Sequence, residues 1–236
     1  MELSRRLEAV ADLVTKGMTV ADIGTDHAYI PIFLVEQKRI PSAIAMDINE
    51  GPLKRAYANI TEHGFQNKIR TRRSDGLREL GIKEVESMIA AGMGGALIIR
   101  ILSDCPEVTE SLKECILQPQ SEIGKVRRFL IENGFFIEKE NIVYEDGKFY
   151  PMMRVIPNKK ETNPYKEEEY EYGKKLLENR NPILKQFLER EICLKNQILE
   201  RLSREKEKPE RMKNRIWEIQ KEISLLDKAL TVYKAE

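Results

Sequence analysis

The chain has 236 residues, 41% of them hydrophobic, which is enough for one full domain with a buried core and a smaller appendage. Its 40 basic residues stand against 39 acidic ones, and the net charge of +1 excludes a global attraction to nucleic acid, so any such binding has to come from local patches. The three cysteines form no CxxC pair, so we expect neither a disulfide framework nor a zinc site, and no metal at all.

The first residues, MELSRRLEAVADLV, place charged side chains inside an apolar pattern. No apolar run there is long enough for a signal peptide or a membrane span. We therefore expect no export, no membrane partner and a cytoplasmic location.

Through the first 160 residues, short apolar β-branched runs alternate with amphipathic stretches, a pattern typical of βα units and a mostly parallel sheet. The last two runs are joined by an Asp-Gly turn at Asp146 and Gly147, which predicts an antiparallel hairpin. The pattern thus predicts an α/β fold with a Rossmann-like sheet of seven strands, the last one antiparallel. The expected strands are Thr19–Ile23, Ala43–Met46, Ile69–Arg73, Ser87–Ala91, Glu114–Leu117, Phe135–Val143 and Lys148–Ile156.

The segment from Pro157 to Pro164 collects prolines, asparagines and charges, and we interpret it as a linker between a domain at residues 1–160 and another at residues 161–236. In the second domain a noisier apolar stripe over residues 184–202 is followed, after a break at residues 203–211, by a heptad seam. This pattern predicts an all-α, antiparallel coiled-coil hairpin. The seam consists of Met212, Ile216, Ile219, Ile223, Leu226, Leu230 and Tyr233.

The periodicity of the hairpin leaves two interpretations of its role open. It is either a stalk or dimerisation device, which we favour from periodicity alone, or an arm that grips a large substrate. We expect the protein to be a monomer or a weak dimer.

The first predicted strand ends in Asp22-Ile23-Gly24, where a glycine lets the backbone turn tightly against a ligand. The fuller GxGxxG pattern is absent, which argues against NAD and for a ligand without a pyrophosphate. Taken alone, the segment is equally compatible with an ordinary βα turn in which Asp22 caps a helix.

Further strand ends carry acids as well. Asp47 follows the glycine turn by about 20 residues, the spacing of a ribose-binding carboxylate. Asp75, followed by Gly76, can accept a hydrogen bond from an adenine amino group. In isolation Asp75 would be better explained as part of a Ser-Asp-Gly turn without a ligand, but three acids at consecutive strand ends favour a single adenosyl ligand. The fourth strand end, at residues 91–95, is nearly bare of side chains, which indicates a close approach to its backbone.

Six segments together resemble the bacterial tRNA (adenine(22)-N1)-methyltransferase family: ADIGTDHAY, AMDIN, RSDGL, AAGMGG, LQPQ and EDGKFY. The resemblance spans the whole chain, and the Gly-Thr-Asp-His and Ala-Gly-Met-Gly-Gly segments are its most specific parts. It implies a class I methyltransferase sheet, S-adenosyl-L-methionine as the cofactor, tRNA as the partner, and methyl transfer to N1 of adenine 22 in the D-arm region.

The resemblance also implies roles for individual residues. The methionine end of the cofactor lies near the glycine turn, the ribose near the second strand and the adenine near the third. The cofactor-binding residues are Asp22, Gly24, Thr25, Asp26, His27, Asp47, Ile48, Asp75, Gly76, Ala91 and Gly92. The catalytic residues are Asp26, His27, Met93 and Gln118. The expected substrate-binding residues are Tyr29, Gln118, Pro119, Gln120 and Tyr150. By residue type the tyrosines are candidate stacking partners for a base, although aromatic side chains near a sheet more often belong to the core.

The residue types suit this chemistry. N1 of neutral adenine carries an in-plane lone pair, so the enzyme needs no strong base and has instead to extract the base, align it and stabilise developing positive charge. Asp26 is the first candidate for electrostatic support, and the Gln118 amide with the backbone near Gly92 for reading the edge of the base. His27 either orients a ligand or only bonds locally. Gln120 stands where the family usually has asparagine, which leaves the role of that position open.

The sequence also bears on other functions. The Asp/Asn-Pro-Pro-aromatic loop of amino-directed methyltransferases is absent, and Asn163-Pro164-Tyr165 is best interpreted as a turn in the linker. The alternatives are another RNA or small-molecule methyltransferase, or a non-catalytic adenosyl-binding module that recruits partners through its coiled coil. Basic clusters that could contact phosphates, though each is more typical of a solvated face, are Arg70, Arg72 and Arg73; Lys125, Arg127 and Arg128; and residues 201–215.

Overall fold

The computed structural model of the chain describes residues 1–204 and 209–234. It divides into two compact units, Met1–Asn163 and Pro164–Glu236, and the predicted linker contains this division. Within the described ranges, no helix is both long and apolar enough to cross a bilayer.

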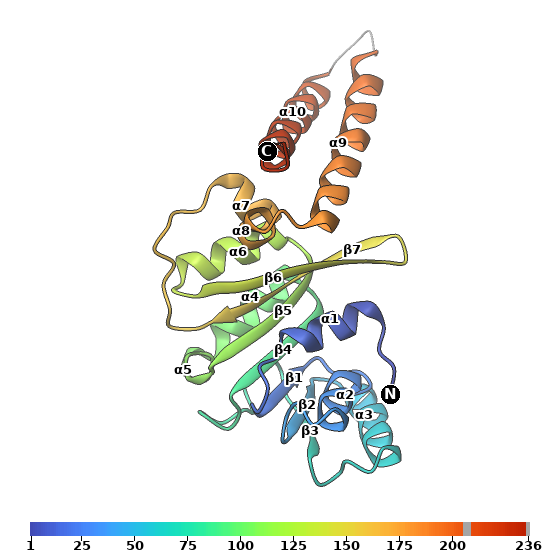
Figure 1. Ribbon diagram of the computed structural model, residues 1–236, viewed down its shortest axis with the longest axis vertical. Coiled ribbons are helices and arrows are strands. Elements are labelled where there is room, and N and C mark those ends of the chain that lie inside the picture. The colour runs from blue at the N-terminus through green and yellow to red at the C-terminus, as the bar shows by residue number, and fades with distance from the viewer. Residues whose placement is uncertain (205–208, 235–236) are drawn as a thin grey trace. The chain divides into compact units, whose positions relative to one another are not determined.

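The first unit is built on a seven-stranded sheet with the order β3-β2-β1-β4-β5-β7-β6 (Figure 1). The first five strands are parallel, and β7 pairs antiparallel with both β5 and β6. The predicted Rossmann-like α/β class with an antiparallel last strand is therefore confirmed. The strands are β1 (Val20–Ile23), β2 (Ala43–Asp47), β3 (Ile69–Arg73), β4 (Ser87–Gly94), β5 (Glu114–Ser121), β6 (Phe136–Glu145) and β7 (Lys148–Ile156).

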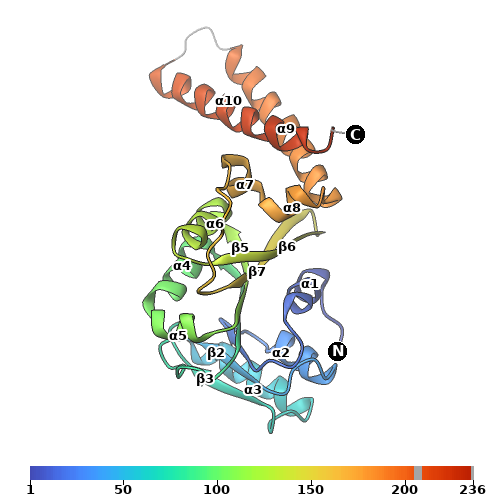
Figure 2. The same ribbon diagram turned by 60° about the vertical axis from the view of Figure 1, so that its left-hand side comes forward.

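Helices cover both faces of this sheet, because alternate side chains of each strand point to opposite sides. Val20 packs into a core with the first three helices, whereas Ala21 and Ile23 pack into the core on the other face. Figure 2 shows the two helical layers from the side. The helices of the first unit are α1 (Arg5–Leu13), α2 (Tyr29–Glu36), α3 (Glu50–Glu62), α4 (Gly95–Asp104), α5 (Pro106–Ser111) and α6 (Ile123–Glu132).

The carboxyl ends of β4 and β5 extend beyond their predicted ends at Ala91 and Leu117. Their pairing is irregular there, with register shifts on either side of Met93. Two local causes are visible: Gly92 has a φ of +78°, and Pro119 has no N–H to donate to the ladder. The result is a bent strand end that exposes the backbone of Gly92.

The second unit contains α7 (Glu167–Tyr172), α8 (Lys174–Glu178), α9 (Pro182–Ser203) and α10 (Glu210–Thr231). The Tyr233 hydroxyl donates to the Asn181 carbonyl at 2.9 Å, and Lys195 of α9 pairs with Glu222 of α10, so α9 and α10 run antiparallel. Every residue of the predicted seam is buried or half-buried. Residues 205–208, inside the predicted break, lie outside the described residues. The two short helices before the hairpin were not predicted.

Candidate active site

The acidic residues singled out in the sequence lie at one edge of the sheet. Strands β3, β2, β1 and β4 are neighbours and parallel, so their carboxyl ends meet at the same edge. Asp47 ends β2, Asp75 follows β3, and the Asp22-Ile23-Gly24 turn ends β1. In the register of β1 and β2, Ile23 pairs with Met46, so the turn at Gly24 and the side chain of Asp47 follow the same rung of the sheet.

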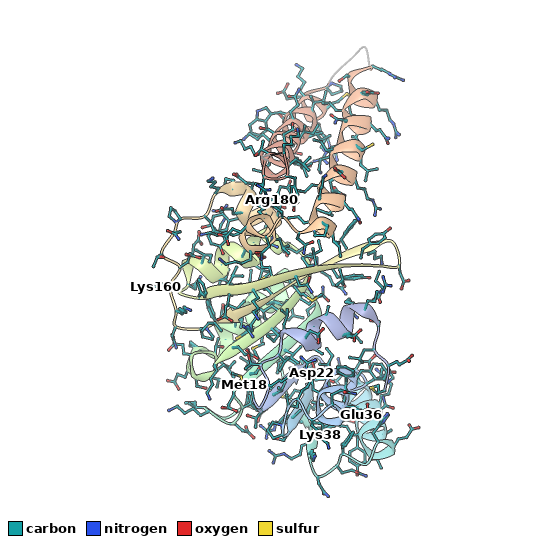
Figure 3. The ribbon with its side chains drawn as sticks, viewed as in Figure 1. Met18, Asp22, Glu36, Lys38, Lys160 and Arg180 are labelled. Atoms are coloured by element: carbon teal, nitrogen blue, oxygen red, sulfur yellow. The ribbon has the colours of Figure 1, made fainter. Side chains whose placement is uncertain are left out.

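Asp22 is a nearly buried carboxyl group, with 8% of the residue exposed (Figure 3). Burial raises its pKa to about 6; the Thr25 hydroxyl opposes the rise, and the negative charge of Asp47 adds to it. The buried Thr25 hydroxyl is near enough for this effect but forms no hydrogen bond of normal geometry within the described structure. Asp22 and Thr25 therefore present polar atoms that can accept further partners.

Gly24 makes the sharp turn after β1 with a φ of +72°. The amides of Gly24 and Thr25 both donate to the Met46 carbonyl, at 2.7 and 2.9 Å. A Cβ on Gly24 would collide with the Cε methyl group of Met93. The glycine turn and Met93, which were assigned to different roles from the sequence, are thus in contact.

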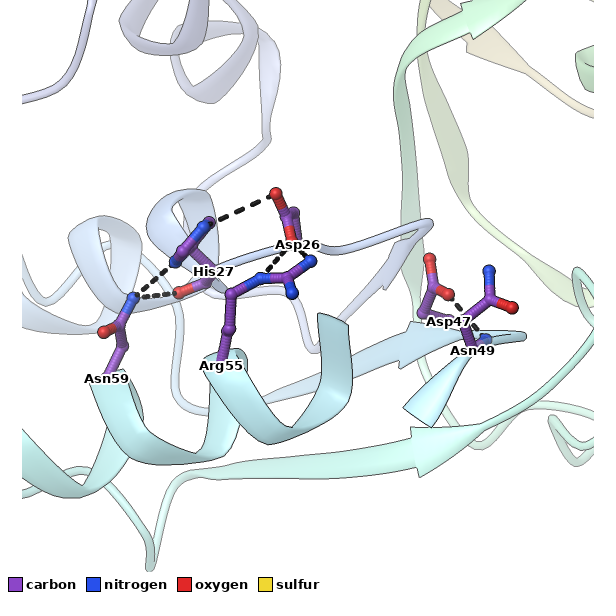
Figure 4. Close-up of polar contacts among 6 residues, drawn as sticks. All are labelled: Asp26, His27, Asp47, Asn49, Arg55 and Asn59. Carbon is purple, nitrogen blue, oxygen red and sulfur yellow. Dashed lines mark hydrogen bonds and ion pairs between the residues drawn. The ribbon is translucent and has the colours of Figure 1, made fainter. Parts of the chain in front are cut away.

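The loop between β1 and α2 is held by side chains of α3 (Figure 4). Arg55 donates from Nε to Asp26 Oδ1 at 2.8 Å, and Asn59 donates from Nδ2 to the His27 carbonyl at 3.0 Å. The His27 ring stacks on Tyr29 with centroids 4.9 Å apart, and its Nε2 lies 3.5 Å from Asp26 Oδ2. Asp26, His27 and Tyr29 therefore form one contiguous group.

The two ring nitrogens of His27 face different partners. Asn59 Nδ2 lies 3.3 Å from His27 Nδ1, whereas His27 Nε2 faces Asp26. Arg55 and Asn59 were not among the site residues predicted from the sequence. Their signal was a spacing of four residues, on one face of the helix that follows the predicted ribose strand.

The two acids assigned to the ribose and the adenine differ in their surroundings. Asp47 Oδ1 accepts the Asn49 amide at 2.7 Å, and Figure 4 shows this turn at the end of β2. Asp75 Oδ1 accepts from Arg100 Nη2 at 2.8 Å, and Arg78 lies 3.8 Å from its other oxygen. A partly exposed pair of arginines thus neutralises Asp75, whereas Asp47 accepts only a backbone hydrogen bond among the described residues.

Around Gly92 the predicted substrate residues separate into buried and exposed ones. The Gln118 side chain is fully buried, and its Oε1 accepts from the Gly92 amide at 3.1 Å and from Arg6 Nη1 at 3.0 Å. Pro119 is also buried, whereas Gln120 is exposed.

The two tyrosines expected to stack on a base differ in their exposure. Tyr29 is 41% exposed, and the half-buried Tyr150 ring has Arg6 Cζ 5.5 Å from its centroid. Arg6, 112 residues from Gln118 in sequence, was missed because no local pattern marks it.

In the first unit, several side chains of the basic clusters are paired with acids. Arg72 and Arg70 both pair with Glu84, and Arg73 pairs with Glu50. The Arg127 side chain is 1% exposed and donates to Glu140 at 2.7 Å, so it is unavailable to phosphates. In the described part of the chain, no group of three or more His, Cys, Asp or Glu side chains could hold a metal ion.

The chain is similar to known methyltransferases in both sequence and structure. A family model described as a methyltransferase domain matches residues 3–153. The tRNA (adenine(22)-N1)-methyltransferase of Bacillus subtilis is 35% identical over 153 residues, which are 65% of this chain and 64% of that enzyme. The aligned segment thus spans just under two thirds of the length of that relative.

Solved structures extend the similarity to nearly the whole chain. The B. subtilis m1A22 tRNA methyltransferase TrmK superimposes with a TM-score of 0.86 at 29% identity, over 97% of this chain and 99% of that one. M. capricolum TrmK, solved with S-adenosyl-homocysteine, gives 0.84 at 31% identity over 98% and 99%. Streptococcus pneumoniae Sp1610, solved with S-adenosyl-L-methionine, gives 0.85 at 32% identity over 97% and 100%. The chain described here belongs to the bacterial tRNA (adenine(22)-N1)-methyltransferase family.

Proposed function

We propose that this protein transfers a methyl group from S-adenosyl-L-methionine to N1 of adenine 22 in tRNA. The observation that carries the proposal is that Asp22 and Asp47, on the adjacent parallel strands β1 and β2, and the glycine turn at Gly24 lie at one edge of the sheet. In parallel α/β sheets this edge is where nucleotide-like ligands bind. The family relatives with bound S-adenosyl-L-methionine or S-adenosyl-homocysteine support the same ligand class.

The polar groups at this edge of the sheet fit the hydrogen-bond donors of this cofactor. S-adenosyl-L-methionine carries an ammonium group, a ribose diol and an adenine amino group, each of which can donate to a carboxylate. The Thr25 hydroxyl is buried without a hydrogen-bond partner in the described structure, and it acts on the nearly buried Asp22 carboxyl. We assign Asp22, Thr25, Asp26 and His27 to the methionine end, Asp47 and Ile48 to the ribose, and Asp75 and Gly76 to the adenine.

When bound, the cofactor supplies an electrophilic methyl group on a sulfonium. The chain needs no strong base, because N1 of neutral adenine already has a free lone pair, and its task is to position the base and to balance the charge that develops on the ring. Asp26 is suited to that task, because its carboxylate is 59% exposed yet is held in place by Arg55. Tyr29, stacked on His27, offers an exposed aromatic face to an extruded base.

The partner in this proposal is a folded tRNA, and a tRNA substrate places the protein in the cytoplasm. We propose that the first unit, Met1–Asn163, is the catalytic domain, and that the helical unit is a separate structural element. The protein acts as a monomer or a weak dimer and requires no metal.

The proposal is tested by incubating the protein with labelled S-adenosyl-L-methionine and an unmodified tRNA transcript that carries adenine 22. Nucleoside mass spectrometry is expected to detect N1-methyladenosine, and reverse transcription is expected to stop at position 22. A matched transcript with guanine 22 should accept no label. N6-methyladenosine, or equal labelling of the guanine 22 transcript, would overturn the assignment of the target atom or of the target site.

The cofactor site is tested separately with Asp47→Ala and the control Asp227→Ala, which removes an exposed carboxylate on α10. Loss of hydrogen bonds from a ribose to a carboxylate costs about 1.5–3 kcal/mol each, so Asp47→Ala should weaken S-adenosyl-L-methionine binding by at least about 10-fold in calorimetry. The control should bind as the wild type does. Equal affinities of the two variants would remove Asp47 from the site.

A further inference from the structure

A three-way hydrogen-bond junction lies beneath the exposed backbone of Gly92. The Gln118 carboxamide, with no exposed surface, is at its centre. Its Oε1 accepts from the Gly92 amide at 3.1 Å and from Arg6 Nη1 at 3.0 Å, and its Nε2 donates to the Pro119 carbonyl at 3.2 Å. Every polar atom of this side chain is therefore used inside the protein.

The junction allows only one orientation of the amide. Rotating the Gln118 carboxamide by 180° would place its NH₂ group against the Gly92 amide and the Arg6 guanidinium, which are both donors. The Gln118 NH₂ group would then face two other donors at part-buried positions, without an acceptor between them. Arg6 thus contributes half of the constraint that keeps Oε1 directed toward Gly92.

Arg6 is itself held from a distant part of the chain. It lies in the first turn of α1, whose N-terminus is capped by Ser4 and by the Glu145 carboxylate, which accepts the Arg5 amide at 2.6 Å. Glu145 ends β6, next to the turn into β7, and the Arg6 guanidinium also lies over the ring of Tyr150. These contacts fix both the backbone and the side chain of Arg6.

We propose that Arg6 is a positioning residue for methyl transfer, acting through Gln118 on the Gly92–Met93 strand end. The inference rests on the proposed function only for its kinetic readout. Gly92 has a positive φ in an irregular part of β4, and Met93 packs on Gly24, so the shape of this strand end depends on a bond that the regular ladder does not supply. Arg6 supports that bond and does not itself contact the substrate.

The competing role for an arginine near a tRNA site is a phosphate contact, and kinetics separate the two. Removal of a phosphate contact raises the KM for tRNA and lowers its dependence on salt, with little change in kcat. Removal of a positioning residue lowers kcat at saturating substrates, since a small misplacement at the reacting centre can cost about 100-fold. Arg6→Ala is therefore expected to lower kcat by about 10- to 100-fold and to change the KM for tRNA by less than about 3-fold.

Arg5→Ala is the matched control, because Arg5 is exposed on the same helical turn and its side chain makes no hydrogen bond or ion pair in the described structure. It should keep wild-type kcat. The double variant of Arg6→Ala with Gln118→Ala should lose no more activity than the more damaged single variant, because both act through one junction. Additive losses, or an unchanged kcat with a raised KM in Arg6→Ala, overturn the proposal.

A measurement without activity keeps the two proposals apart. In the full-length protein, the Gly92 amide should be protected from hydrogen exchange by its bond to Gln118, and Arg6→Ala should speed its exchange by at least about 10-fold, while Arg5→Ala leaves it unchanged. Equal protection in wild type and Arg6→Ala refutes the positioning role even if methyl transfer is confirmed. If Arg6→Ala speeds the exchange of the Gly92 amide but the wild-type protein transfers no methyl group, the proposed function is refuted and the hydrogen-bond junction is supported.

Discussion

At the scale of single residues, Asp22 shows how the candidate site departs from an optimally stable structure. A carboxylate in this position is desolvated by its burial and repelled by Asp47, and the Thr25 hydroxyl offsets only part of the cost. Groups of this kind are typical of ligand-binding sites, where the missing partner is brought by the ligand. Asp22 is thus expected to lower the stability of the ligand-free protein.

This expectation has a defined pH dependence. The pKa of Asp22 is raised from 3.8 to about 6, so the folded state binds the extra proton and stability falls as the pH rises between these values. Asp22→Asn removes this destabilisation. The loss of stability in wild type is absent below pH 3.8 and reaches on the order of 3 kcal/mol above about pH 6. Urea unfolding followed by circular dichroism should show the variant gaining stability over wild type at pH 7.5 but much less at pH 4.

The same substitution should abolish tight S-adenosyl-L-methionine binding, because the variant keeps the shape of the side chain and loses its charge. A variant that is more stable than wild type but does not bind the cofactor would show that the Asp22 carboxylate destabilises the free protein and is required for binding. If the stability difference between Asp22→Asn and wild type were the same at both pH values, the raised pKa would be wrong.

At the scale of elements, each strand end depends on a neighbouring helix. The loop after β1 is held by Arg55 and Asn59 of α3, and the strand end at Gly92 is held by Arg6 of α1. The helical unit has its own apolar contacts, with Leu188 of α9 and Leu226 of α10 both fully buried. We therefore expect mutations in the helical unit to leave the strand ends of the first unit unchanged, and mutations at those strand ends to leave the helical unit unchanged.

Leu226→Ala tests this independence. A buried leucine truncated to alanine costs about 2–5 kcal/mol, and the loss should appear in the unfolding of the second unit. Trp217, the single tryptophan of the chain, lies on the same helix, so its fluorescence reports that transition. Ile198→Ala, at a position that is 42% exposed, is the control and should change stability by less than about 0.5 kcal/mol. A loss of cofactor affinity in Leu226→Ala would contradict the independence of the units.

At the scale of the whole molecule, the division between Asn163 and Pro164 separates the strand-end acids from the helical hairpin. All residues assigned to the cofactor lie before it. We expect a fragment of residues 1–163 to fold, as judged by a cooperative thermal transition, and to bind S-adenosyl-L-methionine within about 3-fold of the intact chain, because the helical unit supplies none of the assigned ligands.

Methyl transfer by the same fragment decides between the two interpretations of the hairpin. If α9 and α10 grip the tRNA, the fragment should show a KM for tRNA raised by at least about 10-fold, because the phosphate contacts of the arm are lost. A KM equal to that of the intact chain would dismiss the arm and leave the stalk or dimerisation device, which sedimentation of the intact chain would then test.

Local patterns in the sequence determined much of the architecture. Apolar period and turn chemistry located all seven strands, because a strand buried in a parallel sheet needs a short β-branched run whatever its neighbours are. The Asp-Gly turn at Asp146 and Gly147 determined the antiparallel ending. The acids at Asp22, Asp47 and Asp75 could be assigned to one edge, because parallel strands share their carboxyl ends.

Only the tertiary structure decided how those residues are supported. Arg6 reaches Gln118 across 112 residues, and Glu145 caps α1 across 140, contacts that leave no trace in local periodicity. The ends of β4 and β5 ran past their predicted limits because the ladder skips Gly92 and resumes beyond it, with Met93 opposite Pro119 and Gly94 opposite Ser121. Propensity is a property of the nearest neighbours in sequence, whereas the orientation of a buried amide depends on whichever donors the fold places around it.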